Sequence, residues 1–173
     1  MSDSSISAPF VAVLMGSDSD LPTMQAAFDQ LNAFSIPFEA KITSAHRTPA
    51  QTHEYVMDAQ ARGCAVFIAA AGMAAHLAGA VAAITTRPVI GVPMESGGLG
   101  GMDALLSTVQ MPGGIPVATV AIGKAGAKNA GYLAAQILGV GDATMAARVA
   151  DERGAQADAV LAKDAALAKT LQP

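Results

Sequence analysis

Cysteine and aromatic residues are scarce in this chain of 173 residues. The one cysteine, Cys64, excludes an intramolecular disulfide and gives no pair of thiolate ligands for a metal. Its place before an apolar run predicts a buried small residue. Tryptophan is absent and aromatics make up only 4% of the chain, although 52% of the residues are hydrophobic. The interior must therefore consist of small aliphatic residues and methionine, which suits helices packed tightly on a sheet.

Charged residues are also few, at 14% of the chain against about a quarter in an average soluble domain. A small monomer with so few charges would leave apolar surface uncovered, so we expect buried interfaces in a homo-oligomer. The net charge of -4 provides no basic patch. We therefore expect no nucleic acid partner.

Signals for targeting are equally sparse. Residues 1–9 are polar and serine-rich, without the basic start and apolar stretch of a signal peptide, so we expect a disordered N-terminus and a cytoplasmic protein. Residues 64–86 carry no formal charge and are long enough to raise the question of a membrane span. However, alanine and glycine dominate this segment and it contains His76. We assign it to a buried strand and a buried helix, and expect no membrane partner.

Short apolar runs alternate with amphipathic segments along the chain. We expect strands at residues 10–15, 38–43, 65–70, 89–92 and 117–122, and helices at residues 21–33, 50–62, 75–85, 102–109 and 125–138. Five such alternations with short connections imply an α/β fold, a three-layer α/β/α sandwich around one parallel sheet. We predict the flavodoxin-like strand order 2-1-3-4-5. Residues 1–173 then form a single domain, with a core over 10–140 and a C-terminal helical extension over 141–173, in one piece or two.

The loop after the second expected strand carries a titratable ring and a guanidinium. Thr48 through Gln51 match a capping box with proline at the first helical position, so capping alone explains Thr48 and Pro49. His46 and Arg47 then fall at the carboxyl edge of the sheet, where open α/β folds bind ligands. They indicate a ligand site, and the alternative is a helix start with a solvated charge.

Three expected loops meet at this edge of a parallel sheet: residues 16–20, 44–47 and 72–76. Together with the free N–H groups of the following helices, their side chains provide hydrogen-bond donors for a phosphate: Ser17, Ser19, Ser44 and Arg47. Asp20 would repel a phosphate but accept hydrogen bonds from sugar hydroxyls. The set indicates a cradle for a ribose phosphate beside a histidine. For Ser19 or Asp20 taken alone, helix capping is the alternative.

Six motifs in fixed order carry a resemblance to a known family: GSDSD at 16–20, SAHRTP at 44–49, AAHL at 74–77, GVP at 91–93, QMPGGIPV at 110–117 and AKNA at 127–130. Over about residues 10–138 the chain resembles the class I N5-carboxyaminoimidazole ribonucleotide mutases of purine biosynthesis. The resemblance implies an octameric flavodoxin-like enzyme. Such an enzyme moves a carboxylate from the exocyclic nitrogen to carbon four of the imidazole, without metal, ATP or biotin.

The resemblance also implies roles for individual residues. His46 corresponds to the catalytic general acid/base, and Asp20 to a contact with the ribose. The remaining substrate-binding positions fall in the same motifs: Ser17, Ser19, Ser44, Ala45, Arg47, Gly72, Ala74, His76 and Leu77. The chain departs from the usual pattern at Met73, where the family commonly has glycine, and at Ala78, where it commonly has proline.

Alternatives remain at this point. A class II aminoimidazole ribonucleotide carboxylase uses carbon dioxide directly, but that class resembles this chain less, with lysine at the position of Arg47 and a different loop at 74–77. A non-catalytic flavodoxin-like module would be a phosphoreceiver, which needs an aspartate after strand three, or a flavin domain, which usually stacks its ring on loop aromatics. Here Tyr55 and Tyr132 fall on expected helices. His53 is expected to be structural and partly buried, and His76 is either structural or a substrate ligand.

Overall fold

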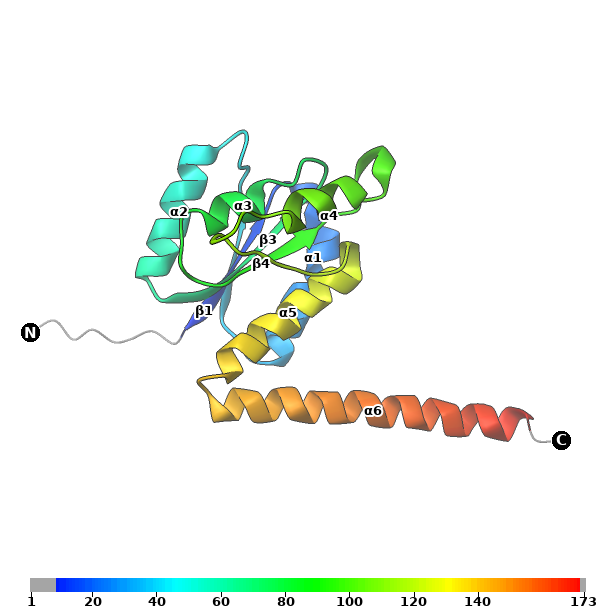
Figure 1. Cartoon of the computed structure of the whole chain (residues 1–173). Helices are drawn as coiled ribbons and strands as arrows, with labels where there is room; N and C mark the ends of the chain where they lie inside the picture. Colours follow the sequence, from blue (N-terminus) through cyan, green and yellow to red (C-terminus); the bar gives the residue numbers. More distant parts are fainter. Residues whose placement is uncertain (1–8, 172–173) are drawn as a thin grey trace, which may run out of the picture.

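The computed structural model describes residues 9–171, so the disorder expected over 1–9 lies, apart from Pro9, outside the described residues. Five parallel strands form one sheet in the order β2-β1-β3-β4-β5 (Figure 1). This confirms the flavodoxin-like order predicted from the sequence. The strands are β1 (Phe10–Met15), β2 (Phe38–Ile42), β3 (Cys64–Ala71), β4 (Val89–Pro93) and β5 (Ala118–Thr119).

Helices cover both faces of the sheet, which completes the three layers (Figure 1). One face carries α1 (Leu21–Ala33) and α5 (Gly123–Gly139). The opposite face carries α2 (Pro49–Ala61), α3 (Leu77–Ala82) and α4 (Met102–Val109). Two 3-10 turns, η1 (Asp18–Asp20) and η2 (Gly97–Leu99), lie in loops that follow β1 and β4.

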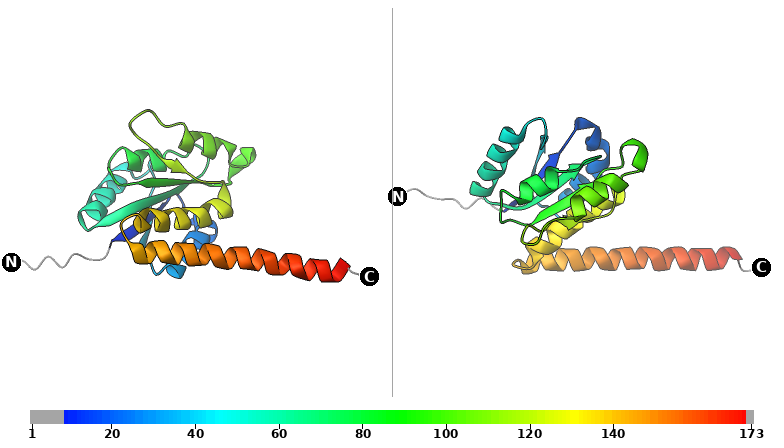
Figure 2. Two further views of the ribbon diagram at one scale, coloured as in Figure 1. Left: turned by 60° about the horizontal axis from the view of Figure 1, so that its bottom comes forward. Right: turned by 45° about the horizontal axis from the view of Figure 1, so that its top comes forward.

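The C-terminal helix α6 (Ala143–Leu171) is one continuous helix, which resolves the expectation of one piece or two. It begins beside α5 and then runs well past the α/β body, as both views in Figure 2 show. Only Met145 and Val149 of α6 are buried. Among the described residues, no helix combines the length and the apolar character that a bilayer crossing requires.

Strand β1 shows why the sheet forms from apolar runs. All six of its residues are buried, because each face of the strand lies under helices. Side chains of a strand alternate between faces, so Val11 and Val13 join the core under α1 and α5, while Ala12 and Leu14 join the core under α2 and α3. The apolar segment 64–86 likewise forms the buried strand β3 and the largely buried helix α3.

Several element boundaries differ from the sequence-based expectations. The last strand pairs only over Ala118 and Thr119, because it lies at the sheet edge with β4 as its one neighbour and the chain then leaves toward α5. Helix α3 is also shorter than expected, spanning residues 77–82. Cys64 begins β3 rather than preceding it, and burial raises the pKa of its thiol to about 11.

The expectation for His53 is wrong. Helix α2 turns Thr52, Val56 and Ala59 toward the core, so the position after Thr52 faces outward and His53 is exposed. A helix advances about 100° per residue, which places residues 52, 56 and 59 on one face and residue 53 on another. His53 is therefore an exposed histidine outside the buried face of α2.

A glycine in β4 sets the distance between α4 and the sheet. A Cβ atom at Gly91 would clash with Cγ2 of Thr108, a buried residue of α4, and would lie 2.9 Å from Cγ1 of Val117. Helix α4 packs on β4 because this position has no side chain.

We therefore predict that Gly91→Ala destabilises the fold. Overpacking of this kind costs about 1–3 kcal/mol in the free energy of unfolding, measurable by urea titration. Gly98→Ala is the matched control, because a Cβ atom at that glycine meets nothing within 4 Å. Equal stability of the two variants would contradict the packing described for α4.

Candidate active site

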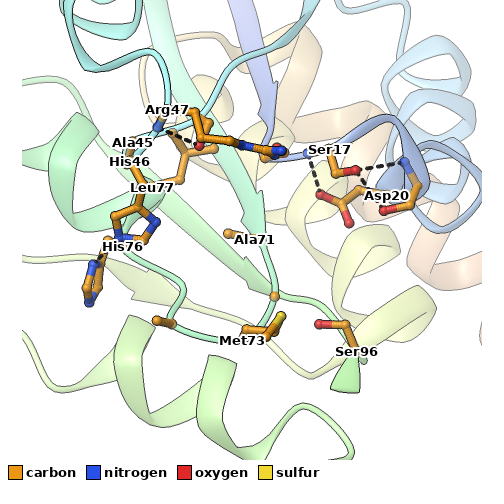
Figure 3. A pocket seen from close by; sticks show the side chains of 15 residues that line it. Ser17, Asp20, Ala45, His46, Arg47, Ala71, Met73, His76, Leu77 and Ser96 are labelled. Carbon is orange, nitrogen blue, oxygen red and sulfur yellow. Dashed lines mark hydrogen bonds between the residues drawn. The ribbon is translucent and has the colours of Figure 1, made fainter.

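A cavity of about 560 Å³ lies at the carboxyl edge of the sheet (Figure 3). The loops that follow β1, β2 and β3 all contribute to its lining, as the parallel topology requires. Each of the site residues expected from the sequence lines it: Ser17, Ser19, Asp20, Ser44, Ala45, His46, Arg47, Gly72, Ala74, His76 and Leu77. Four further residues line the cavity beyond those that the sequence predicts: Gly16, Ala71, Met73 and Ser96.

The loop after β1 is held by a reciprocal pair of hydrogen bonds. The amide of Ser17 donates to Oδ2 of Asp20 at 3.1 Å, and the amide of Ser19 donates to Oγ of Ser17 at 3.2 Å. The Ser19 hydroxyl also donates to Oγ of Ser17, at 2.9 Å. The capping alternative for Asp20 therefore holds in part: its carboxylate caps η1, whereas it makes no side-chain cap bond to α1.

Asp20 is buried, with only 8% of the residue exposed. Burial raises its pKa above the ordinary value, and the hydrogen bond from the Ser17 amide opposes that rise. A buried carboxylate beside a cavity is a strong acceptor for hydroxyl groups, and it repels anions. This end of the cavity is therefore suited to a polyol rather than to a phosphate.

The turn after β2 is closed by Thr48 and Ser44. The amide of Ser44 donates to Oγ1 of Thr48 at 2.9 Å, and the amide of Thr48 donates to the carbonyl of Ser44 at 2.9 Å. The capping box expected at Thr48 is absent, because the Thr48 hydroxyl is engaged by this turn and makes no cap bond to α2. Pro49 begins α2 as predicted.

Arg47 links two of the three loops. Its amide donates to Oγ of Ser44 at 3.1 Å, and its Nη2 donates to the carbonyl of Gly16 at 3.3 Å. Figure 3 shows the guanidinium reaching across the cavity from its own turn toward Ser17. A permanent cation therefore lies beside the serine hydroxyls of the first loop.

Two exposed histidines meet at the mouth of the cavity. Nε2 of His46 lies 2.6 Å from Nδ1 of His76, and the ring centroids are 4.7 Å apart at an interplanar angle of 71° (Figure 3). One of the two nitrogens must donate and the other accept, so the pair couples the tautomers of both rings. The geometry brings His76 to His46 and gives the third loop a direct contact with the second.

The loop after β3 has a strained backbone. Met73 has a φ of 55°, in the left-handed region that favours glycine, and its side chain is 61% exposed. The glycine that the family resemblance leads one to expect at this position would adopt this φ without steric cost. Gly72 precedes it, and a Cβ atom there would overlap with Oγ of Ser96.

Ser96 reaches the cavity from the segment after β4, which the sequence motifs did not single out. The available signal was weak: a serine at the start of a glycine-rich loop at the same edge of the sheet.

The described residues 9–171 contain no cluster of three or more His, Cys, Asp or Glu side chains that could hold a metal ion.

Comparisons with known proteins agree with this geometry. The N5-carboxyaminoimidazole ribonucleotide mutase of Bacillus subtilis is 58% identical over 145 residues, which cover 84% of this chain and 89% of that protein. The protein of the same name from Mycobacterium leprae is 54% identical over 159 residues, covering 92% of each chain.

A solved structure, that of Treponema denticola PurE, superposes with a TM-score of 0.84 at 30% identity. The match covers 92% of this chain and 98% of that one. Residues 10–159 match the family model described as AIR carboxylase. This chain belongs to the AIR carboxylase family.

Proposed function

We propose that this chain is an N5-carboxyaminoimidazole ribonucleotide mutase. It converts N5-carboxyaminoimidazole ribonucleotide into 4-carboxy-5-aminoimidazole ribonucleotide in purine biosynthesis, the activity in the names of relatives 53–58% identical to it. The observation that carries the proposal is the cavity itself, in which a cation, a buried carboxylate and a histidine line one space. Those three groups are what a phosphorylated ribose with a reacting base needs.

The phosphate binds at the Arg47 end of the cavity. The guanidinium supplies a fork of donors, and the hydroxyls of Ser19 and Ser44 lie on the two loops that Arg47 connects. Arg47 also contributes through its charge. The chain as a whole is acidic and would repel a phosphate, and the guanidinium offsets that repulsion at this end of the cavity. Ser17 and Asp20 then face the ribose, where the buried carboxylate accepts from the sugar hydroxyls.

The base lies against the loop that follows β3. In this placement the heterocycle and its carboxylate face the histidine pair and the neighbouring backbone. We assign contacts with the heterocycle and its carboxylate to five lining residues: Ala45, Gly72, Ala74, His76 and Leu77.

The reaction adds one proton to the exocyclic nitrogen and removes one proton from carbon four. The carboxylate departs from the exocyclic nitrogen as carbon dioxide, and that nitrogen gains a proton. Carbon four then attacks the trapped carbon dioxide and forms the new carbon–carbon bond, after which His46 removes the proton from carbon four. A single imidazole can supply the first proton and accept the second, so the enzyme returns to its starting state.

His76 positions the acid/base in this scheme. Its Nδ1 lies 2.6 Å from Nε2 of His46, close enough to hold that ring in one tautomer until the substrate enters. Trapping carbon dioxide also requires a site closed to water. The loops around Gly72 and Gly97 border the cavity and are the parts suited to close it.

A class II carboxylase, using carbon dioxide directly, is the competing activity. Arg47 and the 74–77 loop favour the mutase, since these are the positions at which the two classes differ. Two assays separate the classes. A mutase converts the N-carboxy substrate, whereas a class II carboxylase converts aminoimidazole ribonucleotide in the presence of bicarbonate.

The chain also assembles, in our proposal, into a cytoplasmic homo-octamer in which residues 1–173 form one domain. Exposed apolar side chains on α6 support this, because they would be solvated in a monomer: Val160, Leu161, Leu167 and Leu171. Residues 160, 167 and 171 recur at intervals of seven and four, a helical stripe suited to packing on a neighbour.

His46→Asn should reduce turnover of the N-carboxy substrate by about 10²- to 10⁴-fold, the usual loss for a general acid/base. Binding of the ribonucleotide should remain measurable, because Arg47 and Asp20 are intact. His53→Asn is the matched control, since His53 is an exposed histidine outside the cavity. Near-normal turnover of the His46 variant would refute its assigned role.

Asp20→Asn should stabilise the free protein and weaken ribonucleotide binding. Because burial raises the folded-state pKa of this carboxyl above the unfolded value, its ionisation destabilises the fold as pH rises through that pKa. A neutral amide avoids this cost, so at pH 7 we expect a gain of about 1 kcal/mol or less, a melting temperature higher by up to about 4 °C. Asp29→Asn, at an exposed position of α1, should leave both quantities unchanged. A lower melting temperature for the Asp20 variant would contradict the linkage.

The double variant Val160→Glu, Leu167→Glu should disrupt the assembly, because two carboxylates would be desolvated in the interface. Light scattering of the full chain should then give a mass below that of eight subunits. Val140→Glu is the control, as it adds a charge at an exposed position before α6. An unchanged octamer in the double variant would exclude the α6 stripe as a contact.

A further inference from the structure

Ser96 has a buried hydroxyl that the proposed chemistry does not yet use. The residue follows β4, directly before η2, and it lines the cavity. Its Oγ is closed to solvent and has no hydrogen-bond partner among the described residues. Buried polar atoms in native proteins are nearly always paired, so an unpaired hydroxyl at a ligand cavity indicates a partner that arrives with the ligand.

The position of this hydroxyl is fixed by its neighbours. The amide of Met94 donates to the carbonyl of Ala71 at 2.9 Å, which aligns the ends of β4 and β3. A Cβ atom at Gly72 would overlap with Oγ of Ser96 and lie 3.1 Å from its Cβ. Gly72 therefore leaves open the space that the hydroxyl occupies, and Ser96 lies against the loop that leads to His76.

The cavity distributes its charges unevenly. Among the described residues that line it, Arg47 is the one lysine or arginine. In Figure 3 the side chains of Met73 and Ser96 lie on the opposite side of the cavity from Arg47. In the same view His76 lies beside His46 and away from Ser96, so the Ser96 hydroxyl is the labelled side-chain donor beside Met73.

We propose that the Ser96 hydroxyl donates a hydrogen bond to the migrating carboxylate of the substrate. The inference rests on the proposed function, in which the phosphate occupies the Arg47 end and the carboxylate faces the loop at Gly72. Ser96 is then a substrate-contacting residue at the carboxylate end.

A neutral donor suits a carboxylate that must lose its charge. An arginine or lysine at this place would bind the carboxylate strongly and would be left as a buried unpaired cation once carbon dioxide forms. A hydroxyl orients the carboxylate and also tolerates neutral carbon dioxide, because no net charge is stranded. The Ser96 side of the cavity thus carries the same charge before and after the bond to nitrogen breaks.

Contact with Ser96 requires a small movement of the neighbouring loop, since the hydroxyl is covered in the free protein. Met73 is the part of the loop with room to move, because its side chain is 61% exposed. A Cβ atom at Gly97 would lie 3.8 Å from Cγ of Met73, so the two loops run close together there without a glycine side chain between them.

The test compares two ligands that differ by the carboxylate. Ser96→Ala should bind 4-carboxy-5-aminoimidazole ribonucleotide about 10- to 100-fold more weakly than the native protein, the loss typical of a hydrogen bond to a charged group. It should bind 5-aminoimidazole ribonucleotide, which lacks the carboxylate, within about twofold of the native affinity. Titration calorimetry on the full chain measures both dissociation constants.

Two further variants complete the comparison. Ser107→Ala is the control, because its hydroxyl donates to the Asp103 carbonyl within α4, at 2.7 Å, and does not line the cavity. Ser96→Cys keeps a weaker donor and should give an intermediate loss for the carboxylated ligand. It also serves if the alanine variant fails to fold.

Each outcome bears on a separate statement. An unchanged affinity for the carboxylated ligand, or an equal loss for both ligands, overturns the role of Ser96. If the native protein binds neither ribonucleotide and does not interconvert the two carboxylated forms, the proposed function itself fails.

Discussion

One set of aligned residues at the ends of three strands brings together the loops of the candidate site. Met15, the last residue of β1, is aligned with Ile42 of β2 and Ala70 of β3. The amide of Gly16 donates to the carbonyl of Ala70, and the amide of Thr43 donates to the carbonyl of Met15, each at 2.9 Å. Three chain segments therefore leave the sheet at the same level, and their loops enclose one cavity because parallel pairing holds them in register.

The sequence predicted the features of the fold and the candidate site that depend on local residue patterns. Apolar runs identified β1 and β4 because strands covered on both faces need no polar residues. The loop residues followed, since parallel strands bring their carboxyl ends together. A second group of features was not predicted: the Thr48 hydroxyl bonds to Ser44 within its own turn, and His53 faces outward although its neighbour Thr52 is buried. Ser96 belongs to this second group, because its place depends on Gly72 and no local motif encodes that contact.

The cavity separates a charged end from a neutral one. Arg47 provides a permanent cation where the chain supplies serine hydroxyls, whereas the side near Gly72 has backbone and the hydroxyl of Ser96. Low charge at the reacting end matches a reaction whose intermediate, carbon dioxide, is uncharged. Burial raises the pKa of the Asp20 carboxyl, so its ionised form destabilises the free protein. In the proposed complex, sugar hydroxyls would give this carboxylate hydrogen-bond partners.

The hydrogen bond from Arg47 to the carbonyl of Gly16 has a consequence for the thermodynamics of ligand capture. An unrestrained arginine loses about 2 kcal/mol of rotamer entropy when it is immobilised. In this protein a neutral carbonyl already restricts the guanidinium before any phosphate arrives, and it does so without cancelling the positive charge. Folding therefore already restricts this side chain, and in the proposed phosphate complex more of the attraction between guanidinium and phosphate would contribute to affinity.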